Sequence, residues 1–133
     1  MGMNSEAQLN RKVVDLIKLA NIYLNHFPKH EKYALAQRIR NTAYDVYDLI
    51  TESQKRYHKK TTLSSLDIAH ERLRMQLHLA HQLGYFAFKD GRRHIENGEV
   101  LADKRYLAIS RMVDEVGRMI GGWIAKTKDD QKW

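Results

Sequence analysis

Apolar residues recur every three to four positions along nearly the whole chain, which is the spacing of helices buried on one face. The first such stripe consists of Leu9, Val13, Leu16, Ile17, Ala20 and Leu24. Ser5 with Gln8 three residues later predicts a capping box at the start of this helix. The stretch from Asn25 to Pro28 predicts its end, because proline lacks an N–H and restricts the residue before it.

A second helix is expected from about Pro28 to about His58. Its inner stripe is Leu35, Ile39, Thr42 or Ala43, Val46 and Ile50. Thr62 or Ser64 then predicts the cap of a third helix. That helix carries Leu66, Ala69, Leu73, Leu77, Ala80, Leu83 and either Phe86 or Phe88. Its end is expected near Asp90–Gly91, because glycine is common just past a helix.

After a polar connector from Arg92 to Gly98, a fourth helix is expected to begin near Val100–Asp103. Its stripe is Ile109, Val113, Val116, Ile120 and Trp123, a heptad spacing suited to bundle packing. No strand alternation of useful length is present. The pattern predicts an all-α fold, an antiparallel up-down four-helix bundle. One domain is expected over residues 1–133, with frayed ends at about 1–5 and 127–133.

Two helices carry apolar residues away from the main stripe. They are Tyr33, Ala36, Tyr44 and Tyr47 in the second, and Met112, Met119 and Ile124 in the fourth. A lone bundle buries one stripe per helix, so a second stripe favours self-association. The alternative is a wide core face with ordinary exposed apolar atoms.

The composition narrows the class of protein. The chain has 133 residues, no cysteine and a formal net charge of +7. The missing cysteines exclude disulfides and thiol chemistry, and they fit a reducing, cytoplasmic setting. Neither a signal peptide nor a membrane span is expected. The positive charge favours nucleic acid or an acidic protein as the partner.

Catalytic motifs do not stand out, and neither an enzyme nor a cofactor is expected. The spacing of His70, His78 and His81 is compatible with weak metal binding, but solvated or phosphate-facing histidines are the favoured interpretation. Asp114 and Glu115 are adjacent on a helix, so they diverge and cannot act on one substrate. Gly117 and Gly121 share a face and indicate close helix packing within or between subunits.

The basic residues are the remaining candidates for function. We expect phosphate contacts from Lys55, Arg56, Lys59, Lys60, Arg72, Arg74, Arg111 and Arg118. Arg92, Arg93, His94, Lys104 and Arg105 add to the positive charge outside this set. Tyr57 and Tyr106 are candidates for stacking on unpaired bases. The competing interpretation is a solvated face with intrahelical pairs, Glu71 with Arg74 and Asp114 with Arg118.

Three segments resemble one family of small four-helix bundles. Residues 27–40, FPKHEKYALAQRIR, resemble the opening of that family's second helix, and residues 79–85, LAHQLGY, resemble the end of its third. The family includes the 23S rRNA intervening-sequence proteins and the accessory variability determinant (Avd) of diversity-generating retroelements. Residues 116–125, VGRMIGGWIA, resemble the last helix of Avd. The intervening-sequence branch usually continues with an Ile-Pro-Ala-Asn-Ile-Ala-Glu-Gly-like stretch, which is absent from residues 44–52.

The resemblance to Avd implies a basic, barrel-like homopentamer that is not an enzyme. It would bind the reverse transcriptase and template RNA, or an RNA–DNA hybrid, in support of mutagenic reverse transcription. Three alternatives stay open. They are an intervening-sequence-type protein of unknown role, a scaffold that binds only protein, and a metal-dependent bundle enzyme that uses the three histidines.

Overall fold

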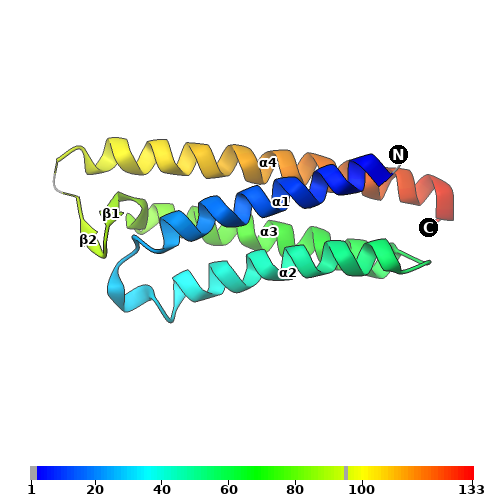
Figure 1. The fold of residues 1–133 in the computed structure, drawn as a ribbon, viewed down its shortest axis with the longest axis horizontal. Helices are drawn as coiled ribbons and strands as arrows, with labels where there is room; N and C mark the ends of the chain where they lie inside the picture. Colours follow the sequence, from blue (N-terminus) through cyan, green and yellow to red (C-terminus); the bar gives the residue numbers. More distant parts are fainter. Residues whose placement is uncertain (1–2, 95) are drawn as a thin grey trace.

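A computed structural model describes residues 3–94 and 96–133. It contains four long helices, α1 (Met3–Leu24), α2 (Leu35–Lys55), α3 (Lys60–Gln82) and α4 (Gly98–Gln131). The helices run alternately up and down, so the start of α1 and the end of α4 lie at the same end of the bundle (Figure 1). Helix α1 packs against α2 and α4, and α3 packs against the same two helices. The prediction of an antiparallel all-α four-helix bundle is confirmed.

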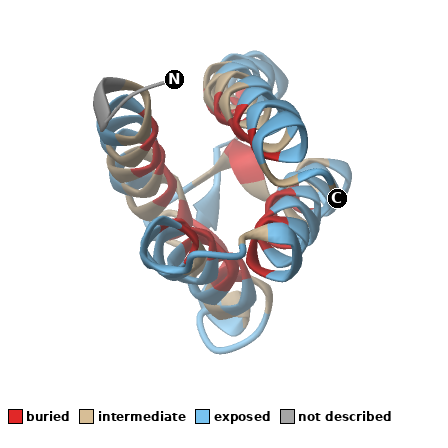
Figure 2. Ribbon diagram, turned by 90° about the vertical axis from the view of Figure 1, so that its right-hand side faces the viewer, coloured by how far each residue is buried: buried red, intermediate tan, exposed pale blue. Residues whose placement is uncertain are grey.

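The core lies along the bundle axis, where the buried face of each helix points inward (Figure 2). The α4 stripe predicted from the sequence is fully in this core, as are all the predicted α1 residues except Ile17, which is half-buried. Leu83, which was predicted to belong to the third helix stripe, lies just past the end of α3 and is 50 % exposed. On α4, Met112, Met119 and Ile124 are half-buried against the chain's own core, which fits the alternative of a wide core face for this helix. Ala36 on α2 is also buried. Tyr44 and Tyr47 on the same helix are exposed, as is Tyr33, which precedes the helix.

The start of α2 differs most from the sequence expectation. The helix begins at Leu35 rather than Pro28, and residues Lys29–Glu31 form a separate 3-10 turn, η1. Ala34 interrupts the helix with φ −117° and ψ −109°. The Glu31 carboxylate accepts a hydrogen bond from the Leu35 N–H at 2.9 Å and another from the Tyr85 hydroxyl at 2.8 Å. Glu31 therefore caps α2 from outside the helix, and a residue distant in sequence holds it there.

The predicted helix caps were wrong. Ser5 lies inside α1, which is already helical at Met3. Thr62 and Ser64 lie inside α3, which begins at Lys60. Their hydroxyls donate to the carbonyls of Lys59 and Lys60, the bond that such side chains make within a helix.

The link between α3 and α4 contains a small hairpin that was not expected. Helix α3 ends at Gln82, followed by Gly84 at φ +79° and a 3-10 turn η2 (Tyr85–Ala87). Strands β1 (Phe88–Lys89) and β2 (Arg92–Arg93) then pair antiparallel. Asp90 and Gly91 are the two turn residues, both with positive φ (52° and 81°), as a two-residue hairpin requires. Asp90–Gly91 is thus a hairpin turn and not the end of a helix.

The C-terminal segment is helical rather than frayed. Helix α4 begins at Gly98, somewhat before the expected Val100–Asp103, and continues to Gln131. Thr127 is buried and Trp133 packs against the core. Gln131 ties this end to the α2–α3 turn, where its side chain accepts from the Lys59 N–H at 3.1 Å and donates to the Tyr57 carbonyl. Within residues 3–94 and 96–133, no helix has the length and apolar character needed to cross a membrane.

Candidate nucleic-acid interface

The four predicted contact residues at the α2–α3 turn have different surroundings. Lys59 is occupied by the end of α2, because its ammonium donates to the carbonyls of Ser53, Gln54 and Arg56 at 2.5, 3.2 and 2.6 Å. Arg56 pairs with Glu52 at 3.1 Å. Lys55 and Lys60 are exposed, and neither is within 4 Å of a carboxylate in the described chain. Only these two remain as free cations at the turn.

The two predicted arginines of α3 have different surroundings. Arg74 forms a two-bond pair with Glu71, at 2.8 and 2.5 Å, which confirms that expected pair. The Glu71 carboxylate, with a smaller effect from Asp114, raises the pKa of Arg74. Arg72 lines the α2–α3 groove beside three carboxylates, those of Asp45, Asp48 and Glu52. A phosphate entering that groove would meet more negative than positive charge, so Arg72 is a poor phosphate contact.

Arg111 and Arg118 are exposed one heptad apart on α4. The expected pair of Asp114 with Arg118 is not formed among the described residues. Asp114 lies instead close enough to Arg74 to influence its pKa, while Glu115 pairs with Lys12 of α1 at 3.1 Å. The adjacent carboxylates therefore diverge, as expected. Arg111 and Arg118 are exposed and form no ion pair in the part of the chain that the structure describes.

A second group of cations lies at the opposite end of the bundle and was not in the predicted contact set. We call it the hairpin end; its basic side chains come from the η1 segment up to Lys32, from α2 and from the β1–β2 hairpin. They are Lys29, Lys32, Arg40, Lys89, Arg92 and Arg93. The hairpin is held against the end of α1, because His26 accepts the Asp90 N–H on its Nδ1 at 3.1 Å and the Gly91 N–H on its carbonyl at 3.2 Å. The sequence did not reveal the hairpin end as a group, because its basic residues come from three separate segments of the chain.

Two other candidates from the sequence, Arg105 and Tyr106, make contacts within the fold, whereas Tyr57 does not. The Arg105 guanidinium donates to the Phe86 and Phe88 carbonyls at 3.3 and 2.7 Å and lies over the Tyr23 ring. Burial lowers the pKa of Arg105. Tyr106 stacks on the His81 ring at 4.1 Å between centroids, so its face is not free for a base. Tyr57 is 82 % exposed and remains available for stacking.

The three histidines do not form a metal site. The His70 Nε2 lies 2.7 Å from the Val113 carbonyl in the core. The His78 Nδ1 lies 3.3 Å from the Tyr106 hydroxyl, and the His81 Nε2 lies 3.6 Å from an Asp103 oxygen. Across residues 3–94 and 96–133, no group of three or more His, Cys, Asp or Glu side chains is arranged to hold a metal ion.

Comparison with known proteins identifies a family. The model of the family described as bAvd-like matches residues 8–127, which include nearly all of the four-helix bundle. No curated protein and no solved structure matches the chain. The match agrees with the resemblance seen in the three sequence segments. By its sequence and its fold, this chain belongs to the bAvd-like family.

Proposed function

We propose that this protein is a non-enzymatic accessory subunit of a diversity-generating retroelement. In this role it binds template RNA, or an RNA–DNA hybrid, together with the reverse transcriptase, and supports mutagenic reverse transcription. Membership of the bAvd-like family supports an Avd accessory protein. The observation that carries the nucleic-acid part is the unneutralised charge of the bundle surface.

That charge is distributed over both ends of the molecule. Only four of the 23 Lys and Arg side chains, those of Lys12, Arg56, Arg74 and Lys126, pair with a carboxylate within 4 Å in the described chain. Sets of exposed cations bind phosphates with little base selectivity. Arg111 and Arg118 on α4 offer one such set, Lys55 and Lys60 lie at the α2–α3 turn, and the hairpin end offers another set.

Salt-dependent RNA binding tests this proposal. We expect the logarithm of affinity to fall linearly with the logarithm of salt concentration. Arg118→Gln should reduce that slope by about 0.7 for single-stranded RNA or about 0.9 for a duplex. Arg74→Gln is the matched control, because its charge is already paired with Glu71, and it should change the slope less. Affinity that is insensitive to salt, or equal effects of the two variants, would contradict phosphate binding at α4.

Binding to the reverse transcriptase distinguishes the proposed function from the alternative of a scaffold that binds only protein. Co-purification of the polymerase with this protein is expected to weaken after nuclease treatment if RNA bridges the two. Capture of the polymerase that is unchanged by nuclease would favour a direct protein contact.

The genomic setting tests the alternative of an intervening-sequence-type protein. A neighbouring reverse transcriptase gene with variable and template repeats supports the retroelement, and an insertion within a 23S rRNA gene contradicts it.

We also propose that the protein assembles as a homopentamer. Such an assembly needs an apolar contact surface, and α3 presents one. Ile68, Met75 and Leu79 are exposed by 60, 48 and 48 % and share one helix face, seven and four residues apart. Exposed apolar faces of this kind mark interaction surfaces. Ile68→Asp is expected to reduce the mass seen by native mass spectrometry. Ile22→Asp on α1, with a similar exposure of 55 %, is the control and should leave the mass unchanged.

A further inference from the structure

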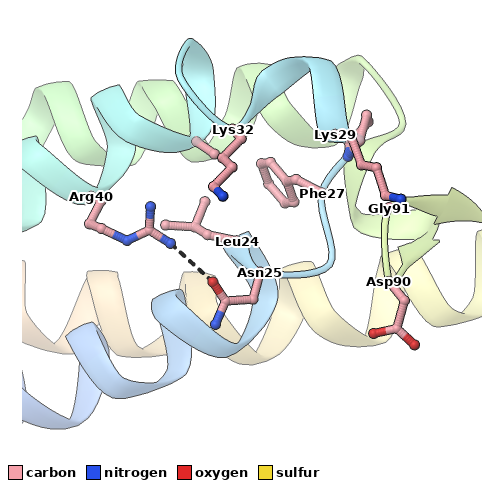
Figure 3. Close-up of a pocket in the computed structure, with 10 residues that line it drawn as sticks. Leu24, Asn25, Phe27, Lys29, Lys32, Arg40, Asp90 and Gly91 are labelled. Carbon is pink, nitrogen blue, oxygen red and sulfur yellow. Dashed lines mark hydrogen bonds between the residues drawn. The ribbon is translucent and has the colours of Figure 1, made fainter.

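A small pocket at the hairpin end combines positive charge with an apolar floor. It lies between the end of α1, the link through η1 and the first turns of α2, and its volume is about 330 Å³ (Figure 3). Its floor is formed by Leu24, Phe27 and Ala36, all buried. The volume is at the low end of the range for small-molecule sites, about 300–1,000 Å³. It has room for one small ligand rather than a stretch of polymer.

Arg40 is held in this pocket by neutral groups. Its Nε donates to the Asn21 Oδ1 at 3.0 Å, and one terminal nitrogen donates to the Asn25 Oδ1 at 3.3 Å. These amides fix the guanidinium plane without neutralising its charge. A fixed, uncompensated guanidinium is suited to bind an oxyanion through two parallel hydrogen bonds.

Two lysines add positive charge that exceeds the acidic charge of the lining. The ammonium of Lys32 points into the space between Arg40 and Phe27, and Lys29 borders the far side of the pocket (Figure 3). Neither lysine is within 4 Å of a carboxylate in the described chain. Asp90 is the one acidic residue of the lining, and its side chain is 80 % exposed. Three cations and one carboxylate give the lining a net charge of +2.

We propose that this pocket binds the terminal phosphate of a nucleotide, either free or at the end of a nucleic-acid strand. A phosphate monoester carries about −1.5 to −2 at neutral pH, which matches the lining, whereas an internal phosphodiester or a single carboxylate carries only −1. Arg40 and Lys32 contact the phosphate oxygens, and the sugar or base lies on Leu24 and Phe27. That the ligand is a nucleotide rests on the proposed nucleic-acid binding. The expected contacts with a phosphate monoester depend only on the residues of the pocket.

Nuclear magnetic resonance titration of the ¹⁵N-labelled protein tests the site directly. The probes are adenosine, 5′-AMP, 3′-AMP, and RNA hexamers with or without a phosphate at either end. We expect the amide signals of residues 24–40 and 89–91 to respond to terminally phosphorylated probes with roughly tenfold higher affinity than to their unphosphorylated counterparts. A response to the phosphorylated hexamers without one to either AMP identifies a strand end as the ligand, and a response to both admits free nucleotides.

Matched variants separate the pocket from general charge. Lys32→Gln is expected to abolish the preference for the terminal phosphate, because it removes a cation that contacts the phosphate. The fold should be unaffected, because the Lys32 side chain is exposed and its recorded contact is a cation–π contact with Tyr33. Lys128→Gln removes the same charge from the far end of α4 and should retain the preference. Arg40→Lys keeps the charge but loses the fixed fork, and should weaken binding without eliminating it.

The outcomes distinguish this inference from the proposed function. No preference for terminal phosphate, or an equal loss in Lys32→Gln and Lys128→Gln, would overturn the pocket even if RNA binds elsewhere. Mononucleotide binding at residues 24–40 without any affinity for RNA would support the pocket and contradict the accessory role in RNA binding.

Discussion

The imidazole of His70 on α3 fills the space that a side chain at Gly117 on α4 would need. A Cβ added at Gly117 would lie 2.7 Å from His70 Cε1 and 3.1 Å from Nε2. The ring cannot easily retreat, because Nε2 is 2.7 Å from the Val113 carbonyl and the residue is only 8 % exposed. The absence of a side chain at Gly117 therefore sets how closely α3 and α4 approach at this level.

Gly117→Ala should destabilise the protein in spite of the better helix propensity of alanine. Propensity favours alanine by about 1 kcal/mol, whereas forcing an extra carbon into a packed core costs typically about 1–3 kcal/mol. Gly121→Ala is the matched control, because nothing lies within 4 Å of its Cβ position, and it should stabilise by about 0.5–1 kcal/mol. Urea unfolding of the two variants measures both effects. A Gly117→Ala protein as stable as Gly121→Ala would show that the α3–α4 contact is looser than described.

His70→Ala is expected to relieve that clash. Alone, the substitution should cost about 1–3 kcal/mol, because it removes the hydrogen bond to Val113 and leaves a small void. Combined with Gly117→Ala, it should cost less than the sum of the two single substitutions, since the new methyl group enters the space that the ring has left. A double-mutant cycle by urea unfolding gives the coupling. Strict additivity would contradict a direct contact between the two positions.

The Glu31 cap predicts a specific acid sensitivity. The hydrogen bond from the Leu35 N–H, followed by that from Tyr85, lowers the pKa of Glu31 below its usual value of 4.5. Because the folded-state pKa is depressed, the stabilisation is complete above the unfolded-state pKa and is lost as pH falls through the folded-state value. Glu31→Gln should therefore flatten the stability curve of the protein below about pH 5. Chemical unfolding of the parent protein and of Glu31→Gln between pH 3 and pH 7, at intervals of about half a pH unit, tests this expectation. Parallel curves of unfolding free energy against pH would contradict it.

Lys59 and its neighbour Lys60 should behave oppositely. Lys59→Met removes the cation that caps the α2 carbonyls and should lower the free energy of unfolding by roughly 0.5–2 kcal/mol. Lys60→Met should leave stability within about 0.5 kcal/mol, because its side chain is exposed and unpaired, but it should weaken RNA binding. Thermal unfolding and RNA titration of both variants decide between these roles. Equal effects in both assays would contradict the assignment.

Much of the candidate site lay beyond what spacing along the chain reveals. Arg74 was expected either to face phosphate or to pair with Glu71, and the structure shows the pair. Lys59 looked like one member of a basic run, and the structure places its ammonium on the end of α2. The hairpin end was missed as a unit because Lys32, Arg40 and Arg92 come from segments that only the folded chain brings together. The Asp90–Gly91 pair was the one local signal of the hairpin, since this dipeptide is a strong marker of a two-residue turn.

The sequence by itself determined the four helices, their inner stripes and the family, because helical periodicity and short motifs are local and survive without knowledge of partners. The tertiary structure decided where the helices begin and which charges are free. Leu35 rather than Pro28 begins α2 because Glu31, bonded to Tyr85 from a distant segment, supplies the cap. Arg40 keeps its charge because the neighbours it meets across α1 are neutral amides. Such pairings join positions far apart in the chain, and hydrogen bonds and ion pairs form only when the two groups lie within a few ångströms of each other.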